Sequence, residues 1–337
     1  MIKYNYSLLN HNTFGFDVKA ERFFDYHTER ELIDFLSDKK NLDIPVFHIG
    51  SGSNLLFVND FNGTILHSSI KSVKIESQTS DNVFVKVSSG VVMDDFCREM
   101  TEKNFGGVEN LSLIYGEVGA CAVQNIGAYG VEIKDVISKV EALEISTQKK
   151  RIFDVSECNY AYRDSIFKNE LKDRFIITSV LFCLTKNPKP NLEYYALKQE
   201  FENQPTPNIK EVREAVIKIR KSKLPDTNIY GNAGSFFKNP YCHTAHFETL
   251  KKSYPNIPYY FVNKDVIKLS AAWLIEQCGF KGKRTGNVGT YQTQPLVLVN
   301  YGGALPSEII NLAKDIQFAV FEKFKIELER EVIYVLQ

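Results

Sequence analysis

The sequence predicts an α+β fold, because stretches with the periodicity of strands and of helices follow one another without an internal repeat. Residues 83–92 carry apolar side chains at the spacing of a strand. Met93 to Glu102 instead places Phe96, Cys97 and Met100 on one face of a helix. At roughly 100 to 200 residues per domain, a length of 337 residues predicts two or three domains.

The chain opens with a turn-like segment, which is followed by a predicted helix. Thr28 and Glu31 form a capping box ahead of apolar residues that recur at helical spacing from Leu32 to Leu36. The next element is a strand from Ile44 to Ile49.

A glycine-rich turn joins that strand to a second apolar run. The turn is Gly50-Ser51-Gly52-Ser53-Asn54, and the run extends from Leu55 to Val58. In a Rossmann-type fold a third glycine and a helix would follow, but Leu55 stands at the glycine position and a strand follows. Two interpretations of the turn stay open at this point: a nest of backbone N–H groups that binds an anion, and a plain tight turn.

A second glycine-rich region spans residues 106–130. Its glycines are interleaved with small and amide-bearing residues, which lets a ligand approach the backbone closely. Two such regions are more than tight turns require. Strand signals recur between Val136 and Leu184, and the proline-containing segment 188–207 predicts a loop or lid.

The last part of the chain predicts helices and a closing strand. A helix from about Asn208 to Lys221 ends in cations, where the helix dipole favours them. A second helix, Leu269 to Cys278, ends at a glycine, and another starts at Pro306. Glu331 to Leu336 predicts a strand.

The composition excludes several classes of protein. The 41 basic residues cancel 41 acidic ones, whereas proteins that coat nucleic acids cluster Lys and Arg. The apolar runs are far shorter than the roughly 20 residues of a membrane-spanning helix. The N-terminus has no basic head followed by an apolar core, so we expect a cytoplasmic protein.

The cysteines predict neither disulfides nor a metal site. All six are scattered without a C-x-x-C pair, in a chain too long to need disulfide staples. Cys242, His243 and His246 lie close together, but no second cluster of Cys and His completes a ligand set, so we expect no metal.

Six separated segments carry a family resemblance. They are Asn12-Thr13-Phe14-Gly15, residues 50–56, 124–130, 162–165, 231–240 and 328–332. Together, and in this order, they resemble the UDP-N-acetylenolpyruvoylglucosamine reductases over almost the whole chain. The match is specific, because six segments would have to agree by accident.

The resemblance implies an FAD-binding domain of the vanillyl-alcohol-oxidase (PCMH) type in two α+β lobes, followed by a C-terminal α+β substrate-binding domain. We expect lobe 1 at residues 1–70, with the C-terminal strand 326–337 returning to the site. Lobe 2 is expected at 71–207 and the substrate-binding domain at 208–325. Lobe 2 includes a tyrosine loop, at about 188–207, that resembles the loop of the type I members.

Members of this family are UDP-N-acetylmuramate dehydrogenases. The resemblance therefore implies an FAD-mediated, NADPH-dependent reduction of UDP-N-acetylglucosamine enolpyruvate to UDP-N-acetylmuramate, a step of peptidoglycan precursor synthesis. The implied cofactor is FAD, and NADPH is the reducing co-substrate. The expected partners are these small molecules, with no nucleic acid, no membrane and no obligate protein partner.

Both glycine-rich regions are expected to bind the cofactor. The first should cradle the FAD pyrophosphate with its backbone N–H groups. By resemblance, the second should line the rest of the cofactor. The expected residues are Gly50, Ser51, Gly52, Ser53, Asn54, Gly116, Gly119, Ala120, Gln124, Asn125, Gly127, Ala128, Tyr129 and Gly130.

The implied reaction needs a group that stabilises charge and a group that supplies a proton. Hydride delivered to the terminal carbon of an enolpyruvyl ether leaves an enediolate on the neighbouring carbon and its carboxylate. Arg163 matches the family's arginine, and its planar fork can hold a carboxylate in two-point contact. Ser235 matches the family's proton donor, although serine is also common in tight turns, and it needs nearby cations or a proton chain to act as an acid.

Glu331 matches the family's glutamate and raises a problem of sign. Its ionised carboxylate would repel the enediolate. Glu331 therefore helps only when it is protonated, or when it orients Arg163 or a water, and the sequence leaves these alternatives open.

Further residues are expected to contact the substrate. In the type I members a tyrosine closes over the substrate. Tyr194 matches that residue better than the adjacent Tyr195 does. Lys223 and Asn239 match positions that contact the nucleotide sugar, although the helix dipole explains Lys223 equally well. Tyr162 is expected beside the substrate. The chain departs from the family's usual residues at Tyr115, Ala272 and 290–294, so substrate contacts in 285–295 are not carried over.

Two other functions stay open at this point. One is another FAD-dependent oxidase or dehydrogenase of the same cofactor fold, and the other is a non-catalytic nucleotide-sugar binding protein. A flavin absorbance band would argue against an apo binding module. Bleaching of that band by NADPH, and its return with the enolpyruvyl sugar nucleotide, would separate the two enzymes.

Overall fold

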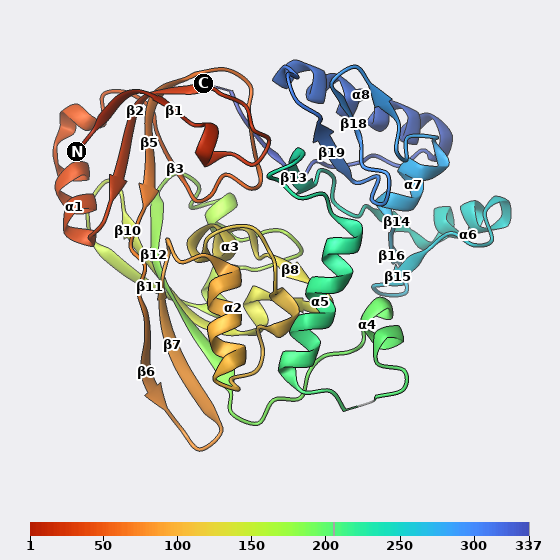
Figure 1. The fold of residues 1–337 in the computed structure, drawn as a ribbon, viewed down its shortest axis with the longest axis horizontal. Coiled ribbons are helices and arrows are strands. Elements are labelled where there is room, and N and C mark those ends of the chain that lie inside the picture. The colour runs from red at the N-terminus through yellow and green to blue at the C-terminus, as the bar shows by residue number, and fades with distance from the viewer. Residues whose placement is uncertain (205, 337) are drawn as a thin grey trace. The chain divides into compact units, whose positions relative to one another are not determined.

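The computed structural model describes residues 1–204 and 206–336. Pro205 of the predicted tyrosine loop and Gln337 of the predicted C-terminal strand lie outside the described residues. The chain forms two compact units. The first contains residues 1–6, 20–52 and 61–220, and the second contains residues 7–19, 53–60 and 221–337. Both units combine helices with strands (Figure 1).

The elements of the first unit lie mainly before residue 221. Its strands are β1 (Lys3–Ser7), β2 (Lys19–Tyr26), β3 (Val46–Ile49), β5 (Phe61–Ser68), β6 (Val73–Gln78), β7 (Asn82–Ser88), β8 (Gly127–Ala128), β9 (Val131–Glu132), β10 (Ile137–Glu144), β11 (Lys150–Asp154) and β12 (Phe175–Thr185). Its helices are α1 (Glu29–Ser37), α2 (Met93–Glu102), α3 (Val118–Gln124), α4 (Tyr195–Glu200) and most of α5 (Ile209–Lys223).

The second unit contains the C-terminal elements and one short strand from the first part of the chain. Its strands are β4 (Leu55–Phe57), β13 (Gly231–Ser235), β14 (Tyr241–His243), β15 (Tyr259–Phe261), β16 (Val266–Leu269), β17 (Arg284–Thr285), β18 (Val288–Thr290), β19 (Val297–Asn300) and β20 (Ile333–Val335). Its helices are α6 (Thr244–Ser253), α7 (Ala271–Gln277) and α8 (Pro306–Phe324).

Two sheets form the framework of the first unit, with strand orders β1-β2-β5-β3 and β11-β10-β12-β7-β6. In β7, Val83, Val85 and Val87 are buried and alternate with less buried residues, as a half-covered strand requires. Residues of α2 and α3 share one hydrophobic core with β7, β10 and β12. The rings of Phe96 on α2 and Phe182 on β12 lie 4.4 Å apart, and Figure 1 shows α2 alongside this sheet.

The first residues of the chain form strands rather than the predicted turn-like segment. β1 pairs with β2, and β2 lies parallel to β5. The predicted helix that follows is α1, in which Thr28 accepts a hydrogen bond from the Glu31 N–H at 3.1 Å. The Glu31 carboxylate in turn accepts from the N–H of His27 at 2.7 Å. The capping residues thus begin α1 close to where the sequence predicts it.

The predicted loop 188–207 contains a helix, α4, which corrects the expectation of an irregular segment. Leu197 and Phe201 pack against Val212 and Val216 of α5. Leu197 and Phe201 are four positions apart, so their apolar side chains lie on one helical face and are stable only when another apolar surface covers them. The segment is therefore anchored by a small core of its own.

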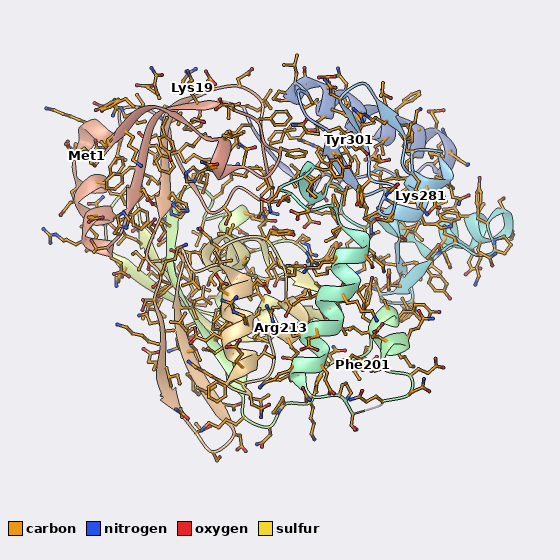
Figure 2. All side chains as sticks on the ribbon, in the orientation of Figure 1. Met1, Lys19, Phe201, Arg213, Lys281 and Tyr301 are labelled. Atoms are coloured by element: carbon orange, nitrogen blue, oxygen red, sulfur yellow. The ribbon has the colours of Figure 1, made fainter. Side chains whose placement is uncertain are left out.

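α5 is also tied to α2 by charge. Arg213, labelled in Figure 2, lies 2.6 Å from the Asp94 carboxylate, and both side chains are largely buried. The Asp94 carboxylate also accepts from the N–H of Leu113 at 2.6 Å. Burial by itself would raise the pKa of Asp94, but these contacts hold it below its usual value.

The second unit is built on the sheets β13-β19-β18-β17 and β14-β16-β15. α8 packs on β18 and β19 and also contacts α7. β20 lies parallel to β4, and the N–H of Val58 donates to the carbonyl of Val335 at 3.0 Å. The predicted closing strand is therefore shorter than expected, and it binds the segment 53–60 into this unit.

Across residues 1–204 and 206–336, no helix combines the length and the apolar character that crossing a membrane would need.

Candidate functional site

The helix α3 lies in the middle of the second glycine-rich region, for which the sequence predicts no helix. Its first turn is fixed by backbone hydrogen bonds from Val118 to the carbonyl of Val91 and from Gly119 to the carbonyl of Ser89, both 2.9 Å. A Cβ on Gly119 would lie 2.6 Å from the Cβ of Ser89. Glycine is therefore required for α3 to approach the turn after β7 so closely.

The first glycine-rich turn lies against α3. A Cβ on Gly50 would be 3.2 Å from the Cβ of Ala120. Gly52 has a φ of +65°, which glycine adopts without strain. The structure therefore brings together the start of the first predicted cofactor-binding segment and α3 of the second. It also confirms the strand-turn-strand order β3, turn, β4.

The same turn offers hydrogen-bond donors. Gly52 is buried, and among the described residues no protein acceptor receives the backbone N–H of Ser51 or Gly52. Buried N–H groups are nearly always paired, so the N–H of buried Gly52, next to that of half-buried Ser51, fits an anionic ligand such as a diphosphate. The other two residues of the turn, Ser53 and Asn54, belong to the second unit.

Asn125 connects the end of α3 to the segment that carries Arg163. It is fully buried and has a φ of +48°. Its side-chain amide donates to the carbonyl of Ala161 at 2.8 Å and to the carboxylate of Glu132 at 3.1 Å. Its side-chain oxygen accepts from the N–H of Lys134 at 3.2 Å. One buried side chain thus joins the end of α3 to two other stretches of the chain, residues 132–134 and Ala161.

Arg163 lies at the tip of a tight turn. Ala161 and Asp164 exchange two backbone hydrogen bonds of 3.1 Å, and the φ of Arg163 is +56°. Its guanidinium donates to the carbonyl of Gly127 at 2.7 Å. A non-glycine residue in this conformation is strained, and such strain is concentrated at functional sites.

Further contacts fix the same turn. The hydroxyl of Ser165 donates to the carbonyl of Val123 at 2.5 Å. The guanidinium carbon of Arg163 lies 5.2 Å from the ring centroid of Tyr162. The structure therefore brings the predicted residues Asn125, Gly127, Tyr162 and Arg163 together within the first unit.

Tyr194 lies beside another predicted cofactor-binding residue. The rings of Tyr194 and Tyr129 are 5.0 Å apart and meet edge to face, at 74°. Tyr195, in contrast, is exposed, and its hydroxyl accepts from the side chain of Gln199. The geometry therefore favours Tyr194 over Tyr195 as the tyrosine of this segment that reaches the glycine-rich region.

Arg220, one of the cations at the end of α5, is half-buried. Its guanidinium donates to the carbonyl of Leu113 at 3.1 Å and also interacts with Tyr129. Burial lowers the pKa of Arg220. Arg213 and Arg220 are seven residues apart, so they lie on the same face of α5. This spacing is the sequence signal that could have predicted that both arginines face the interior of the unit.

In the second unit, Ser235 ends β13 beside an irregularity. The pairing of β13 with β19 shifts register between Asn232 and Ser235, and Gly234 has a φ of +67°. The Asn232 side chain accepts from the N–H of Gly234 at 3.0 Å. The bulge changes the direction in which Ser235 leaves the sheet.

The segment 12–15 supports this bulge. The N–H of Asn232 donates to the carbonyl of Thr13 at 2.9 Å. A Cβ on Gly231 would lie 2.0 Å from the carbonyl oxygen of Phe14. Two of the segments that carry the family resemblance are therefore packed directly on each other.

Glu331 is held by its backbone next to the Ser235 segment. Its N–H donates to the carbonyl of Phe236 at 2.9 Å, and its carbonyl accepts from the side chain of Asn54 at 3.0 Å. Its side chain is half-buried. Within the second unit the structure thus brings together Asn54, Glu331 and the residue after Ser235.

The predicted substrate residues Lys223 and Asn239, and Lys238 next to Asn239, take part in local bonds. The side-chain oxygen of Asn239 accepts from the N–H of Ala271 at 3.0 Å. Lys238 forms a 2.6 Å ion pair with Glu329. The carbonyl of Lys223 accepts from the hydroxyl of Thr293 at 2.9 Å, which ties the end of α5 to the segment 290–294.

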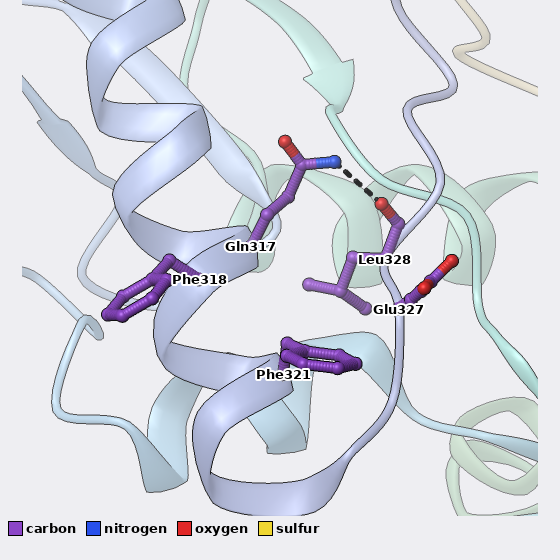
Figure 3. Close-up of a pocket in the computed structure, with 5 residues that line it drawn as sticks. All are labelled: Gln317, Phe318, Phe321, Glu327 and Leu328. Atoms are coloured by element: carbon purple, nitrogen blue, oxygen red, sulfur yellow. Dashed lines mark hydrogen bonds between the residues drawn. The ribbon is translucent and has the colours of Figure 1, made fainter.

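A surface hollow of about 340 Å³ lies on α8 (Figure 3). It is lined by Gln317, Phe318, Phe321, Glu327 and Leu328. None of the predicted site residues lines it, and Gln317 donates to the carbonyl of Leu328 across it at 2.7 Å.

Two family models match the chain. A model described as "FAD binding domain" matches residues 20–154, which include the glycine turn and α3. A model described as "UDP-N-acetylenolpyruvoylglucosamine reductase, C-terminal domain" matches residues 225–335, which include Ser235 and Glu331.

Curated relatives match almost the whole chain. A UDP-N-acetylenolpyruvoylglucosamine reductase of Bacteroides fragilis is 46% identical over 330 residues, which cover 98% of this chain and 99% of the relative. The reductase of Flavobacterium johnsoniae is 47% identical over 334 residues, which cover 98% of each.

A solved structure shows the same fold. The UDP-N-acetylenolpyruvylglucosamine reductase of Thermus caldophilus matches with a TM-score of 0.70 and 20% identity, and the match covers 99% of both chains. The predicted α+β fold with an FAD-binding domain is confirmed, and so is the resemblance read from the six segments.

Proposed function

The chain belongs to the UDP-N-acetylenolpyruvoylglucosamine reductase family of FAD-dependent oxidoreductases of peptidoglycan synthesis, and from this premise we propose that it reduces UDP-N-acetylglucosamine enolpyruvate to UDP-N-acetylmuramate with NADPH. The observation that carries the proposal is the 46% identity over 98% of the chain with a reductase of that name. The proposed activity is that of a UDP-N-acetylmuramate dehydrogenase that works in the cytoplasm.

FAD is held by the two glycine-rich regions in this proposal. The backbone N–H groups of Ser51 and Gly52, with the adjoining residues up to Asn54, bind the diphosphate. Residues 116–130 line the remainder of the cofactor. The hydride would come from FAD bound at these residues, with NADPH as the reductant. The two-lobed division at 1–70 and 71–207, followed by a substrate domain at 208–325, belongs to the same proposal.

Arg163 binds the carboxylate of the enolpyruvyl group. Its turn is held at the Ala161 carbonyl by Asn125, and its guanidinium already contacts the carbonyl of Gly127. As negative charge grows on the substrate carboxylate, the attraction to the guanidinium grows, so the contact lowers the barrier as well as binding the ground state.

Ser235 donates the proton to the second carbon of the enolpyruvyl group. Its place beside the β13 bulge gives it a backbone fixed by Asn232 and Gly234. Glu331, whose backbone is bonded to Phe236, is the second group proposed to stabilise the enediolate.

The nucleotide sugar is bound by Tyr162, Tyr194, Lys223 and Asn239. The edge-to-face contact of Tyr194 with Tyr129 supports its role, because it links the tyrosine segment to the cofactor-binding region. Lys223 supplies a positive charge suited to a diphosphate.

The experiment that tests this proposal separates the two half-reactions in Ser235→Ala. Reduction of the flavin by NADPH should proceed at the normal rate, while reoxidation by the enolpyruvyl sugar nucleotide without oxygen should slow by roughly 10² to 10⁴, the usual contribution of a general acid. Ser253→Ala, at an exposed position of α6, serves as the matched control and should leave both rates unchanged. Equal slowing of both half-reactions in Ser235→Ala would show that this serine is structural.

A further inference from the structure

A chain of charged side chains lies in the first unit, with His67 and Glu117 buried and Lys71 at its exposed end, and the proposed reaction does not use it. His67 on β5 is 8% exposed. One ring nitrogen, Nδ1, lies 2.9 Å from the carboxylate of Asp25, and the other, Nε2, lies 3.1 Å from the carboxylate of Glu117. An imidazole donates from both nitrogens only when it is protonated, so the two carboxylates fit the charged ring.

The chain links elements that are far apart in the sequence. Asp25 lies opposite His67 in the parallel pair of β2 and β5. Glu117 is the N-cap residue just before α3, yet its side chain forms no capping bond within that helix. Instead it faces His67 and lies 3.4 Å from the ammonium of Lys71, which also donates to the carbonyl of Gly90. The sheet β1-β2-β5-β3 and the start of α3 are thereby joined.

Glu117 also touches the first glycine-rich turn. A Cβ placed on Gly50 would lie 3.4 Å from Glu117 Oε2 and 3.5 Å from Glu117 Cβ. The carboxylate therefore packs against the backbone of the turn. Any movement of Glu117 changes the spacing between this turn and α3.

The charges of the chain balance only while His67 is protonated. Asp25 and Glu117 contribute two negative charges, and His67 and Lys71 contribute two positive ones. A neutral His67 leaves one negative charge in excess beside the turn and withdraws one of the two ring hydrogen bonds. A negative charge at this place repels a diphosphate.

Other titratable groups face the chain from neighbouring elements. His27 lies 3.8 Å from the Asp25 carboxylate, and the Ser69 hydroxyl donates to that carboxylate at 2.7 Å. His48 on β3 bonds the hydroxyl of Tyr26 at 2.8 Å. Burial, with the charge of His67, lowers the pKa of His48 to about 3, so His48 stays neutral throughout the neutral range.

We propose that protonated His67 is a positioning residue for FAD binding: by holding Glu117, it sets the glycine turn against α3 and keeps the local charge compatible with a diphosphate. The inference rests on the proposed binding of the FAD diphosphate by the turn Gly50–Asn54. Burial by itself would lower the pKa of His67, but its bonds to Glu117 and Asp25 raise it above the usual value. The affinity for FAD is therefore complete below the ordinary histidine pKa and decreases as the pH rises through the raised value.

The test is a titration of the full-length apoprotein with FAD at pH values from 6 to 9.5, in which binding is monitored by the quenching of flavin fluorescence. The dissociation constant of the wild type should increase roughly 5- to 20-fold over this range, the size of a modest coupling between sites. In His67→Gln, FAD should bind more weakly at pH 6, and the dependence on pH should disappear. Glu117→Gln should flatten the profile as well, because the link between the ring and the turn is lost.

The matched control is His27→Gln. This histidine also lies near Asp25, but its side chain is 65% exposed, and its replacement should leave the wild-type profile intact. A wild-type affinity that is constant from pH 6 to 9.5 overturns the inference, as does a His67→Gln profile that still follows that of the wild type. If His67→Gln does not fold, Glu117→Gln and the wild-type profile decide.

The inference and the proposed function fail in different ways. A protein that binds FAD with a flat pH profile and still reduces the enolpyruvyl substrate refutes only the role of His67. A protein that shows the predicted pH profile but does not turn over that substrate refutes only the proposed reaction.

Discussion

Asn125 is the residue through which the end of α3 holds the Arg163 turn, and its replacement by alanine measures that link. The substitution removes two neutral hydrogen bonds, to Ala161 and from Lys134, and one to the Glu132 carboxylate. At about 1 kcal/mol for each neutral bond and about 1.5 kcal/mol or more for the charged one, the bonds contribute roughly 3.5 kcal/mol. A φ of +48° adds about 1 kcal/mol, because alanine tolerates this conformation less well than asparagine does.

The free energy of unfolding of Asn125→Ala should therefore be lower than that of the wild type by about 4 to 5 kcal/mol, a large part of the usual 5–15 kcal/mol. The assay is urea unfolding of the apoprotein, followed by circular dichroism. Asn104→Ala is the matched control, because Asn104 has a φ of +58° and an exposed side chain, so its replacement should lower the stability by only about 1 kcal/mol. If the two variants lost equal stability, the three buried bonds would not hold the turn, and the reasoning would be wrong.

Three further predictions concern the first unit. Tyr194→Phe should keep the ring contact and the flavin spectrum but bind the nucleotide sugar roughly 5-fold more weakly, which is the effect of one lost hydrogen bond. A titration of the nucleotide sugar against the bound flavin's spectrum measures this affinity, and loss of the flavin would contradict the role of Tyr194. Gly119→Ala places a methyl group 2.6 Å from the Cβ of Ser89, so it should lower the free energy of unfolding by about 1–3 kcal/mol and weaken FAD binding. An unchanged melting temperature would contradict the tight contact. Burial raises the pKa of Asp94, but its contacts with Arg213 and the N–H of Leu113 together lower it below the usual value, so the Asp94–Arg213 pair should stabilise the fold at pH values above the ordinary Asp pKa and lose this effect as the pH falls through the lowered pKa. Urea unfolding at pH 7 and pH 3 should therefore show a smaller difference in stability in Arg213→Met than in the wild type.

Elements with a strong local pattern could be predicted from the sequence. α2 has the predicted bounds, Met93–Glu102, because its buried side chains recur at helical spacing. α7 ends before Gly279, whose φ is +78°, as the glycine predicts. The strand-turn-strand at Gly50 to Asn54 followed from Leu55, which breaks the Rossmann pattern.

Elements whose stability comes from tertiary contacts were missed. α3 is a short helix of mostly small residues buried on several sides, so it has no amphipathic period to detect. The predicted loop 188–207 contains α4 because Leu197 and Phe201 find their partners on α5.

Distant pairing explains the rest of the difference. His67 is 42 residues from Asp25 and 50 residues from Glu117 along the chain, so no local pattern joins the three. The sequence predicts a helix-dipole role for the cations that end α5, whereas the acceptor of Arg220, the carbonyl of Leu113, lies 107 positions away along the chain. The family resemblance pointed to Ser235 and Glu331, and the structure adds the backbone bond between Glu331 and Phe236.

The most direct test of the proposed reaction is a single anaerobic experiment on the purified protein. NADPH is added until the flavin absorbance band is bleached, the excess is removed, and UDP-N-acetylglucosamine enolpyruvate is then supplied. The band should return in full, with one UDP-N-acetylmuramate formed for each flavin reoxidised. A flavin that stays reduced until oxygen is admitted would contradict the account.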